Sequence, residues 1–355
     1  MREPQCGKYA AYAAFSSPLR DKSLRNEEMM GISISLCMIV KNEEKVLERC
    51  LDSVADLMDE IIIVDTGSTD RTKEIAKKYT QLLYDFTWVD DFSAARNFAF
   101  SKATKEYIYS ADADEVLDEE NRQKFRDLKE VLLPEIEIVQ MRYCNQLANG
   151  TAYNFDAEYR PKLYRRQREF VWIEPVHEMV RLDPVVYDSD IDILHMPEQV
   201  HSGRDFRVFQ KHIQNGMRLS KRLHHMYAME LAISGTDADV LEAEDYFAAS
   251  AMDSSRSLDE MREAACIVTR AARLRDDSHT ILKMCLKDLL SEGSSEMCYE
   301  LGEYFYGKKD YAEAAMWYYN AMHECQSILN IHTSTDWAEK RYEECAEKVE
   351  QTEEF

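Results

Sequence analysis

Along the first part of the chain, continuous apolar runs alternate with stretches in which apolar residues recur at helical spacing. Largely apolar runs at 34–40 and 60–66 are each followed by a stretch with apolar residues at helical spacing, at 42–57 and 68–79. Apolar runs of this length are typical of buried strands, and the amphipathic stretches are typical of helices packed on a sheet. The order strand, helix, strand, helix predicts a parallel sheet with helices on its faces.

The same rhythm continues and then changes character near Glu135. Beyond that residue the strands become longer and alternate in polarity, as expected of antiparallel additions to the sheet. After Asp205 almost the whole pattern is helical. We expect further strands at 81–86, 106–111, 135–145 and 157–166, with a helix at 92–103.

The last third of the chain carries a helical-hairpin repeat. Large, small and aromatic residues fall where the tetratricopeptide pattern places them, at Leu301, Gly302, Phe305, Ala314, Tyr318 and Ala321. One repeat length upstream, the same positions are filled by a degraded copy, at Ile267, Val268, Ala271 and Thr280. We expect two or three stacked hairpins, in which Gly302 and Ala314 allow close approach of paired helices, and a cap formed by 333–351.

These patterns divide the chain into four expected parts. The fold class is α/β, with a mostly parallel sheet, followed by an all-α repeat region. Residues 1–31 lack a sustained period and are expected to be a poorly ordered extension. The α/β domain is expected at 32–205, a connecting helix at 206–235 and the helical repeats at 236–355.

Charge and composition exclude several classes of protein. The formal net charge of -23 would repel a polyphosphate backbone, so nucleic-acid binding is not expected. No stretch approaches the roughly 18 apolar residues that a membrane helix needs, and the N-terminus lacks an export signal, so we expect a cytoplasmic protein. The 9 cysteines form no CxxC pair, which favours reduced thiols over disulfides or a zinc site.

Acidic residues follow two of the predicted strands directly. Asp65 ends the second strand, and Asp112, Asp114 and Glu115 follow the fourth. Ligands of open α/β sheets bind beyond the carboxyl ends of the strands. Residues two apart on an extended chain project to the same side, so Asp112 and Asp114 can face one magnesium- or manganese-class cation. Alternatively, these acids stabilise the start of a helix capped by Asp118.

Four segments, taken together, resemble the family-2 glycosyltransferases with the GT-A fold. In chain order they are SLCMIVKNEEKVLERCLDSV, IIIVDTGSTDRTKEIA, DDFSAARNFAFSKA and YSADADEVL. The resemblance implies that 32–205 is a GT-A catalytic domain. It also implies that Asp112 and Asp114 are the DxD pair, with Asp114 on the metal that bridges the donor diphosphate. The remaining donor-binding residues implied are Asp65, Lys41, Glu43, Arg96 and Asn97.

A catalytic base is expected from the second half of this domain, where the acceptor would lie. The segment EPVHEMV offers His177 and Glu178, and DIDILHMPE offers His195. We assign Glu178 as the base, His195 as a metal or diphosphate ligand, and His177 as the alternative for either role. Each histidine could instead be a core or interface imidazole. The basic run 160–168 is either a phosphate-binding segment or a solvated edge strand.

The layout resembles that of bacterial peptide glycosyltransferases, including those that modify bacteriocins. It implies an inverting, metal-dependent hexosyl- or N-acetylhexosaminyltransferase that uses a UDP-sugar or related donor, with a peptide or a glycan as acceptor. The alternatives are a cell-surface polysaccharide glycosyltransferase and a non-catalytic repeat scaffold with a decayed transferase domain. The helical repeats would select a polypeptide acceptor or form a homodimer. Their tyrosines outside the repeat core, expected to be free for binding, are Tyr304, Tyr306 and Tyr319.

Overall fold

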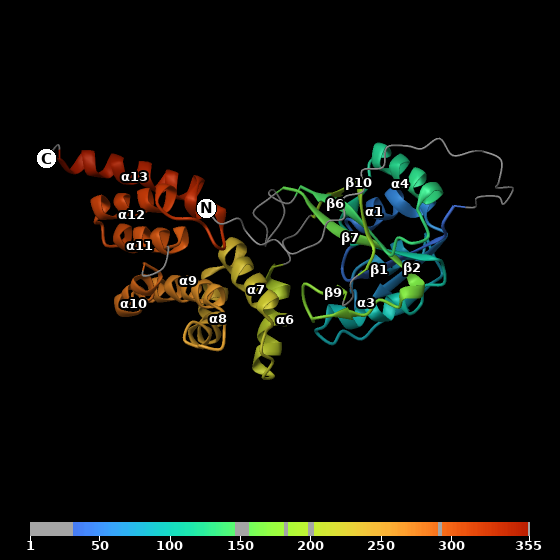
Figure 1. The fold of residues 1–355 in the computed structure, drawn as a ribbon, viewed down its shortest axis with the longest axis horizontal. Coiled ribbons are helices and arrows are strands. Elements are labelled where there is room, and N and C mark those ends of the chain that lie inside the picture. Colours follow the sequence, from blue (N-terminus) through green and yellow to red (C-terminus); the bar gives the residue numbers. More distant parts are fainter. Residues whose placement is uncertain (1–30, 146–155, 181–183, 198–201, 290–292, 354–355) are drawn as a thin grey trace.

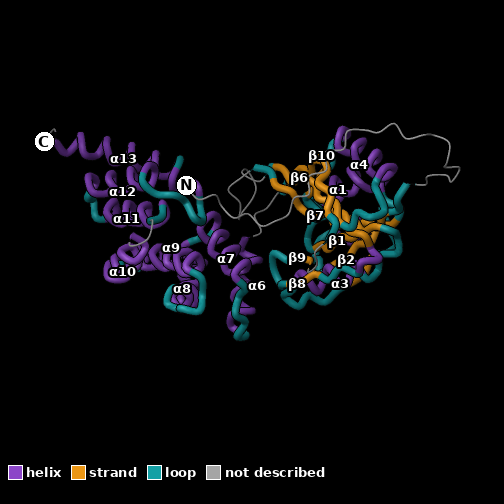
Figure 2. Tube along the Cα trace, in the orientation of Figure 1, coloured by secondary structure: helices purple, strands orange, loops and turns teal. Residues whose placement is uncertain are grey.

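The computed structural model describes residues 31–145, 156–180, 184–197, 202–289 and 293–353. An α/β part and a helical part follow one another along the longest axis (Figure 1). All strands of the described residues lie in the α/β part, as the colours of Figure 2 show. The expected extension at 1–31 lies outside the described residues, except for Gly31.

The α/β part is built on an eight-stranded sheet with the order β3-β2-β1-β4-β7-β6-β10-β5. Its first half is parallel, as predicted, because β1 pairs in parallel with β2 and β4, and β2 with β3. These strands are β1 (Ile34–Val40), β2 (Glu60–Asp65), β3 (Leu83–Asp85) and β4 (Tyr107–Ser110).

The second half of the sheet is mixed. The strand β7 (Glu158–Arg165) is antiparallel to both β4 and β6 (Ile138–Cys144), so the predicted antiparallel addition is confirmed. Because β7 lies inside the sheet, the interpretation of its basic residues as an edge strand is wrong. The remaining strands, which the hydrophobic pattern did not single out, are β10 (Val186–His195), β5 (Glu115–Val116) and the separate pair β8 (Trp172–Ile173) and β9 (Met179–Val180).

Alternate residues of the central strand feed two hydrophobic layers, one on each face of the sheet. From β1, Leu36 and Met38 join the layer that contains Leu51 and Phe125, whereas Cys37 joins the layer that contains Ala99. The flanking helices are α1 (Leu47–Val54), the 3-10 turn η1 (Ala55–Leu57), α2 (Thr72–Ala76), α3 (Phe92–Phe100) and α4 (Glu119–Val131). Helices therefore cover both faces, as the βα rhythm predicts.

The stretch 206–235, expected to be one connecting helix, holds two. They are α6 (Ser202–Gln214) and α7 (Lys221–Ser234), and the cap of α7 at Ser220 explains the break, because its hydroxyl accepts a hydrogen bond from the Leu223 amide. The remaining helices are α8 (Asp237–Ser250), α9 (Leu258–Leu274), α10 (Ser278–Leu289), α11 (Ser295–Gly307), α12 (Tyr311–His323), η3 (Ile331–Ser334) and α13 (Asp336–Glu353).

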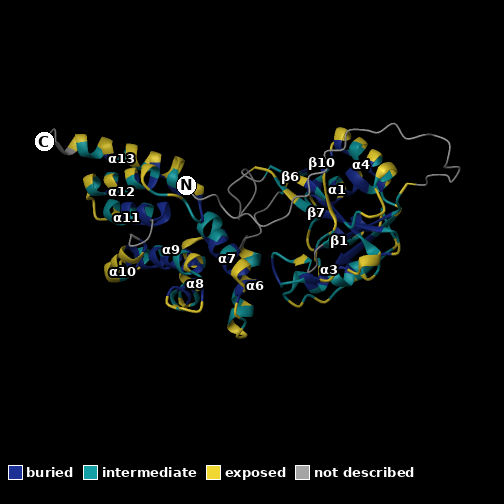
Figure 3. Ribbon diagram, in the orientation of Figure 1, coloured by how far each residue is buried: buried dark blue, intermediate teal, exposed yellow. Residues whose placement is uncertain are grey.

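The repeat residues pack as the tetratricopeptide pattern predicts. Ala314 and Tyr318 are buried in one cluster with Cys298 of α11, whereas Leu301 is buried in the larger core that includes α9, and Figure 3 shows the buried character of α9 and α11. A Cβ atom on Gly302 would lie 2.5 Å from a ring carbon of Tyr318, so the close approach requires glycine. None of the described helices is long and apolar enough to cross a membrane.

Candidate active site

Polar side chains gather where the parallel strands end. The strands β1, β2 and β4 run in the same direction, so their carboxyl ends meet at one edge of the sheet. Lys41 and Glu43 follow β1, Asp65 ends β2, and Asp112 and Asp114 follow β4. Burial alternates after β4, and both aspartates lie on the less buried side.

Asp65 is almost fully buried, at 1% exposure. Its Oδ2 accepts hydrogen bonds from the amides of Gly67 (3.0 Å) and Ser68 (2.9 Å), and lies 3.4 Å from the ammonium of Lys73. Its Oδ1 is buried without a hydrogen-bond partner among the described residues. A buried oxygen without a donor is costly, so this atom is a candidate acceptor for a ligand hydroxyl or base N–H.

The loops after β1 and β2 are tied to each other. The Asn42 side chain accepts a hydrogen bond from the Thr69 amide (2.7 Å), and the amide of Glu43 donates to the Thr72 hydroxyl (2.7 Å). These bonds fix the backbone that presents Lys41, which is exposed, and Glu43, which is half-buried. Burial, followed by the negative charge of Asp114, raises the pKa of Glu43 to about 7.

Arg96 bridges two of the predicted acids. From α3, its Nη2 donates to Asp112 Oδ1 (2.8 Å), its Nε pairs with Glu178, and its Nη1 donates to the Ser110 hydroxyl (2.9 Å). Arg96 and Glu178 have side-chain exposures of only 13% and 11%. Burial alone would raise the pKa of Asp112, but the Arg96 guanidinium, followed by Lys162, outweighs it and lowers that pKa well below its usual range.

Asp114 meets His195 through the pairing of two strands. The short strand β5 begins one residue after Asp114 and is antiparallel to the end of β10, with Glu115 opposite His195. The Met196 amide donates to the Asp114 carbonyl (2.9 Å), which fixes this register. As a result, His195 Nε2 lies 3.2 Å from Asp114 Oδ2, and the imidazole packs against Tyr143 at 5.1 Å.

The Asp114 and His195 atoms fit two ligand positions of a divalent cation. Adjacent corners of an octahedron with bonds of about 2.1 Å lie about 3.0 Å apart, close to the observed 3.2 Å. Among the described residues no three His, Cys, Asp or Glu side chains gather as a metal cluster. Asp112 is turned to Arg96 in this arrangement.

Two of the predicted site residues have other partners. The Asn97 amide group donates to the Trp172 carbonyl and accepts from the Trp172 amide, each at 2.9 Å, so it holds β8 on α3. His177 Nε2 lies 3.3 Å from Glu230 Oε2 on α7, and its ring is 5.9 Å from that of Phe209. His177 therefore belongs to the contact with the helical part, the interface alternative considered above.

One buried ion pair beneath the cluster did not emerge from the sequence. Lys162 on β7 pairs with Glu115, at side-chain exposures of 6% and 2%. Burial raises the pKa of Glu115 although the Lys162 charge acts against that rise. The only sequence signal was a lysine within a strand of alternating polarity. The pair itself could not be predicted, because it depends on β7 lying next to β4 in the sheet.

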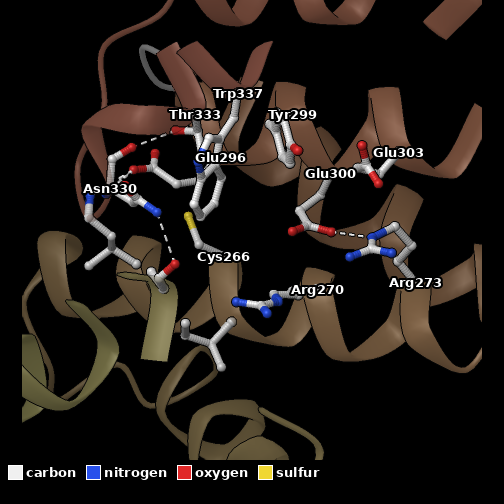
Figure 4. A pocket seen from close by; sticks show the side chains of 13 residues that line it. Cys266, Arg270, Arg273, Glu296, Tyr299, Glu300, Glu303, Asn330, Thr333 and Trp337 are labelled. Carbon is white, nitrogen blue, oxygen red and sulfur yellow. Dashed lines mark hydrogen bonds and ion pairs between the residues drawn. The ribbon is translucent and has the colours of Figure 1, made fainter. Parts of the chain in front are cut away.

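A hollow of about 170 Å³ lies between α9, α11 and the segment around η3 in the helical part (Figure 4). Arg270 and Arg273 come from α9, opposite Tyr299 on α11 and Trp337 on α13. The two aromatic rings are 6.1 Å apart. Tyr304, Tyr306 and Tyr319, expected to be free for binding, do not line this hollow. The aromatic residues that line the hollow are instead Tyr299 of α11 and Trp337 of α13.

The site lies within a segment that matches a known family. Residues 35–180 match the model of glycosyl transferase family 2. This range contains Asp65, Arg96, Asp112, Asp114 and Glu178, whereas His195 follows it. The chain therefore carries a family-2 glycosyl transferase domain, and the mostly parallel sheet covered by helices confirms the GT-A fold expected from the sequence.

Individual relatives match shorter segments. The SunS glycosyltransferase from the SPbeta prophage of Bacillus subtilis is 41% identical over 103 residues, 28% of this chain and 24% of the relative. A TPR repeat-containing protein of Synechococcus elongatus is 54% identical over 84 residues, 24% of this chain and 21% of the relative. An uncharacterised glycosyltransferase of Rickettsia typhi is 28% identical over 181 residues, 45% of this chain and 55% of the relative.

The chain thus spans between about a fifth and about half of the length of these relatives. Among solved structures, glucosyl-3-phosphoglycerate synthase from Mycobacterium tuberculosis aligns over 54% of this chain and 82% of that chain, with 14% identity and a TM-score of 0.39. A similarity of this size says nothing about what this chain binds.

Proposed function

We propose that the chain is a metal-dependent, inverting glycosyltransferase that uses a nucleotide-diphosphate sugar. The observation that carries this proposal is the convergence of two units at the strand ends. One is the ion-paired series Asp112, Arg96 and Glu178, and the other is the pair Asp114 and His195. Asp65, whose buried oxygen lacks a donor among the described residues, ends β2 at the same edge of the sheet.

In this proposal the donor lies across the ends of β2 and β4. Asp65 accepts a hydrogen bond from the nucleoside, next to the fixed loops that present Lys41 and Glu43. Asp114 and His195 would hold a magnesium or manganese ion, which supplies positive charge where the leaving diphosphate becomes negative. The chain's own contribution is to place its carboxylate and imidazole so that both can face the same ion.

Glu178 is the proposed base. Its carboxylate pairs with Nε of Arg96 while Asp112 pairs with Nη2, so one guanidinium orients both carboxylates. A base on the acceptor side and a diphosphate on the opposite side suit a single displacement with inversion at the sugar carbon. His177 is less suited to this role because its imidazole is turned to Glu230.

The proposed acceptor is a polypeptide. The helical hairpins form a hollow with aromatic rings at Tyr299 and Trp337 beside arginines, and such mixed apolar and charged surfaces suit an extended peptide. A polysaccharide acceptor is the alternative. To separate them, transfer of labelled sugar to a peptide library and to a glycan panel would be compared for wild type and Trp337→Ala.

The peptide proposal expects Trp337→Ala to lower peptide transfer by about 10-fold, the scale for losing an aromatic anchor, without affecting donor hydrolysis. Tyr342→Ala, which removes a partly exposed ring outside the hollow, is the control. Labelling of the glycan panel alone would contradict a peptide acceptor.

The catalytic proposal is tested by turnover. A panel of UDP-, GDP- and dTDP-sugars would be incubated with the chain in manganese, magnesium or a chelator, and released nucleotide measured. We expect hydrolysis of one donor class in metal and none in chelator. Absence of turnover with every donor would favour the non-catalytic scaffold.

A further inference from the structure

The loop before β9 has an unusual backbone for its residue types. Glu174 and His177 have φ values of 71° and 47°, in the left-handed region that residues with a Cβ rarely adopt. Such conformations persist when the surrounding structure holds them. The next residue along the chain is Glu178, whose carboxylate pairs with Arg96. The position of Glu178 therefore depends on what holds this loop.

Helix α7 of the helical part supplies that hold. Arg222 Nη1 donates to Glu174 Oε2 and to the His177 carbonyl, both at 2.6 Å, so one guanidinium spans the loop. The Ser220 hydroxyl donates to the other oxygen of Glu174 at 2.7 Å. Glu174 has a side-chain exposure of 15%, so water screens these bonds only partly.

Two other side chains of the loop, those of Val176 and His177, also contact the helical part. His177 Nε2 lies 3.3 Å from Oε2 of Glu230, which is completely buried on α7. Val176 is buried in the same hydrophobic core as Phe209 of α6 and Tyr227 of α7. Through Val176 the loop 174–178 joins the hydrophobic core of the helical part, although it belongs to the α/β part by sequence.

Helix α6 anchors the opposite partner of the ion pair. Lys211 pairs with Asp90, and the imidazole of His212 lies 2.9 Å from the Asp90 carbonyl, just before α3 begins. The Phe92 amide of α3 donates to the Pro175 carbonyl at 2.9 Å. Arg96 is one turn further along α3, so α6 contacts the segment that leads into the helix carrying Arg96.

We propose that Arg222 and Glu230 are positioning residues for catalysis, which clamp the loop 174–178 so that Glu178 faces Arg96. The proposal rests on the proposed role of Glu178 as the base. Arg222 and Glu230 lie on α7. They act through Glu174 and His177, and so connect α7 with the loop that carries Glu178.

The clamp is tested first without any substrate. Hydrogen exchange of the amides in 174–180 would be compared for wild type, Arg222→Ala and Lys221→Ala. Lys221 is the neighbour of Arg222 on α7 and pairs with the exposed Asp259 at 2.9 Å, so it is the matched control. We expect exchange to rise about 10-fold or more in Arg222→Ala and to stay unchanged in Lys221→Ala, since only the former loses bonds to the loop. Unchanged exchange in Arg222→Ala would overturn the clamp, whatever the chain catalyses.

Kinetics then test positioning against a merely structural role. For the donor that wild type hydrolyses fastest, we expect Arg222→Ala to lower kcat by about 10- to 100-fold, because a misplaced catalytic group costs rate, with KM nearly unchanged. Arg222→Lys keeps a charged donor and should recover part of the rate, and Lys221→Ala should match wild type. Faster loop exchange in Arg222→Ala with normal kcat would overturn the positioning role. An inactive wild type would instead refute the proposed function, while exchange still decides the clamp.

Discussion

Arg96 is the residue on which the geometry of the site depends. Its guanidinium contacts Asp112, Glu178 and Ser110, and the pair of Arg96 with Glu178 is largely shielded from water. A planar guanidinium can hold two carboxylates at fixed angles, which an ammonium cannot do as well. The negative charges that the sequence places near each other are thus kept in defined positions before a donor arrives.

The proposed base gives a prediction at this scale. Glu178→Gln should retain donor binding and lose transfer by roughly 100-fold or more, because the amide keeps the shape of the side chain but cannot take a proton. Transfer rates and donor affinity would be measured in parallel. Glu169→Gln, an exposed carboxylate nearby in the sequence, should behave as wild type. Near-normal transfer by Glu178→Gln would move the base elsewhere.

The sequence predicted which residues gather at the strand ends but not how they pair. Asp65, Asp112 and Asp114 could be placed because parallel strands bring their carboxyl ends together. The contact of Asp114 with His195 joins residues 81 positions apart and depends on the register of β5 against β10. His177 and Glu178 are neighbours in sequence, and only the clamped backbone sends one to Glu230 and the other to Arg96.

Among the helices and strands, the packing of the repeat could be predicted from the sizes of its side chains. A small residue on α11 faces an aromatic ring on α12, and this could be predicted because the pattern specifies both. In contrast, the division of 206–235 into α6 and α7 was missed, because the Ser220 cap is a weak signal in the sequence.

Gly302 therefore gives a stability prediction. Gly302→Ala should lower the free energy of unfolding by about 1 to 3 kcal/mol, because the added Cβ would overlap the Tyr318 ring. Gly307→Ala, in the same helix but with no atom within 4 Å of the added Cβ, should change it little. Denaturant unfolding of both variants measures the difference. Equal stability of the two would show that α12 shifts to accept the methyl group.

The start of α9 gives a pH prediction. Burial alone would raise the pKa of Glu260, but hydrogen bonds from Ser257 and the ion pair with Arg256 outweigh it and lower the pKa to about 2. A pKa below the ordinary 4.5 means that this carboxylate stabilises the fold above pH 4.5, and that the stability is lost as pH falls toward 2.

Glu260→Gln should accordingly lower the free energy of unfolding at pH 7 by about 1 to 3 kcal/mol and flatten its decline between pH 4.5 and 2. Asp259→Asn, an exposed neighbour, is the control. Denaturant unfolding of both variants and wild type between pH 4.5 and 2 tests this prediction. A decline as steep as in wild type would contradict the assigned pKa.

At the scale of the whole molecule, the two parts share structure at the site. The helical part is placed so that α6 and α7 touch the loops on which Arg96 and Glu178 depend. If the proposed roles hold, a peptide bound to the repeats would influence Glu178, the proposed base, through the proposed clamp. The sheet and the repeats each follow a sequence pattern and could be predicted separately. The contact between the two parts could not, because it joins side chains that are far apart in the sequence, such as Glu174 and Arg222.

We propose that Asp114 and His195 bind the metal ion of the donor site. Calorimetry of donor binding to wild type and Asp114→Ala, in manganese and in chelator, tests it most directly with the sugar nucleotide that the turnover panel identifies. We predict binding by wild type in manganese, and at least about 10-fold weaker binding in chelator and in Asp114→Ala, because the diphosphate then lacks its counter-charge. Equal affinity of wild type in manganese and in chelator would contradict the claim.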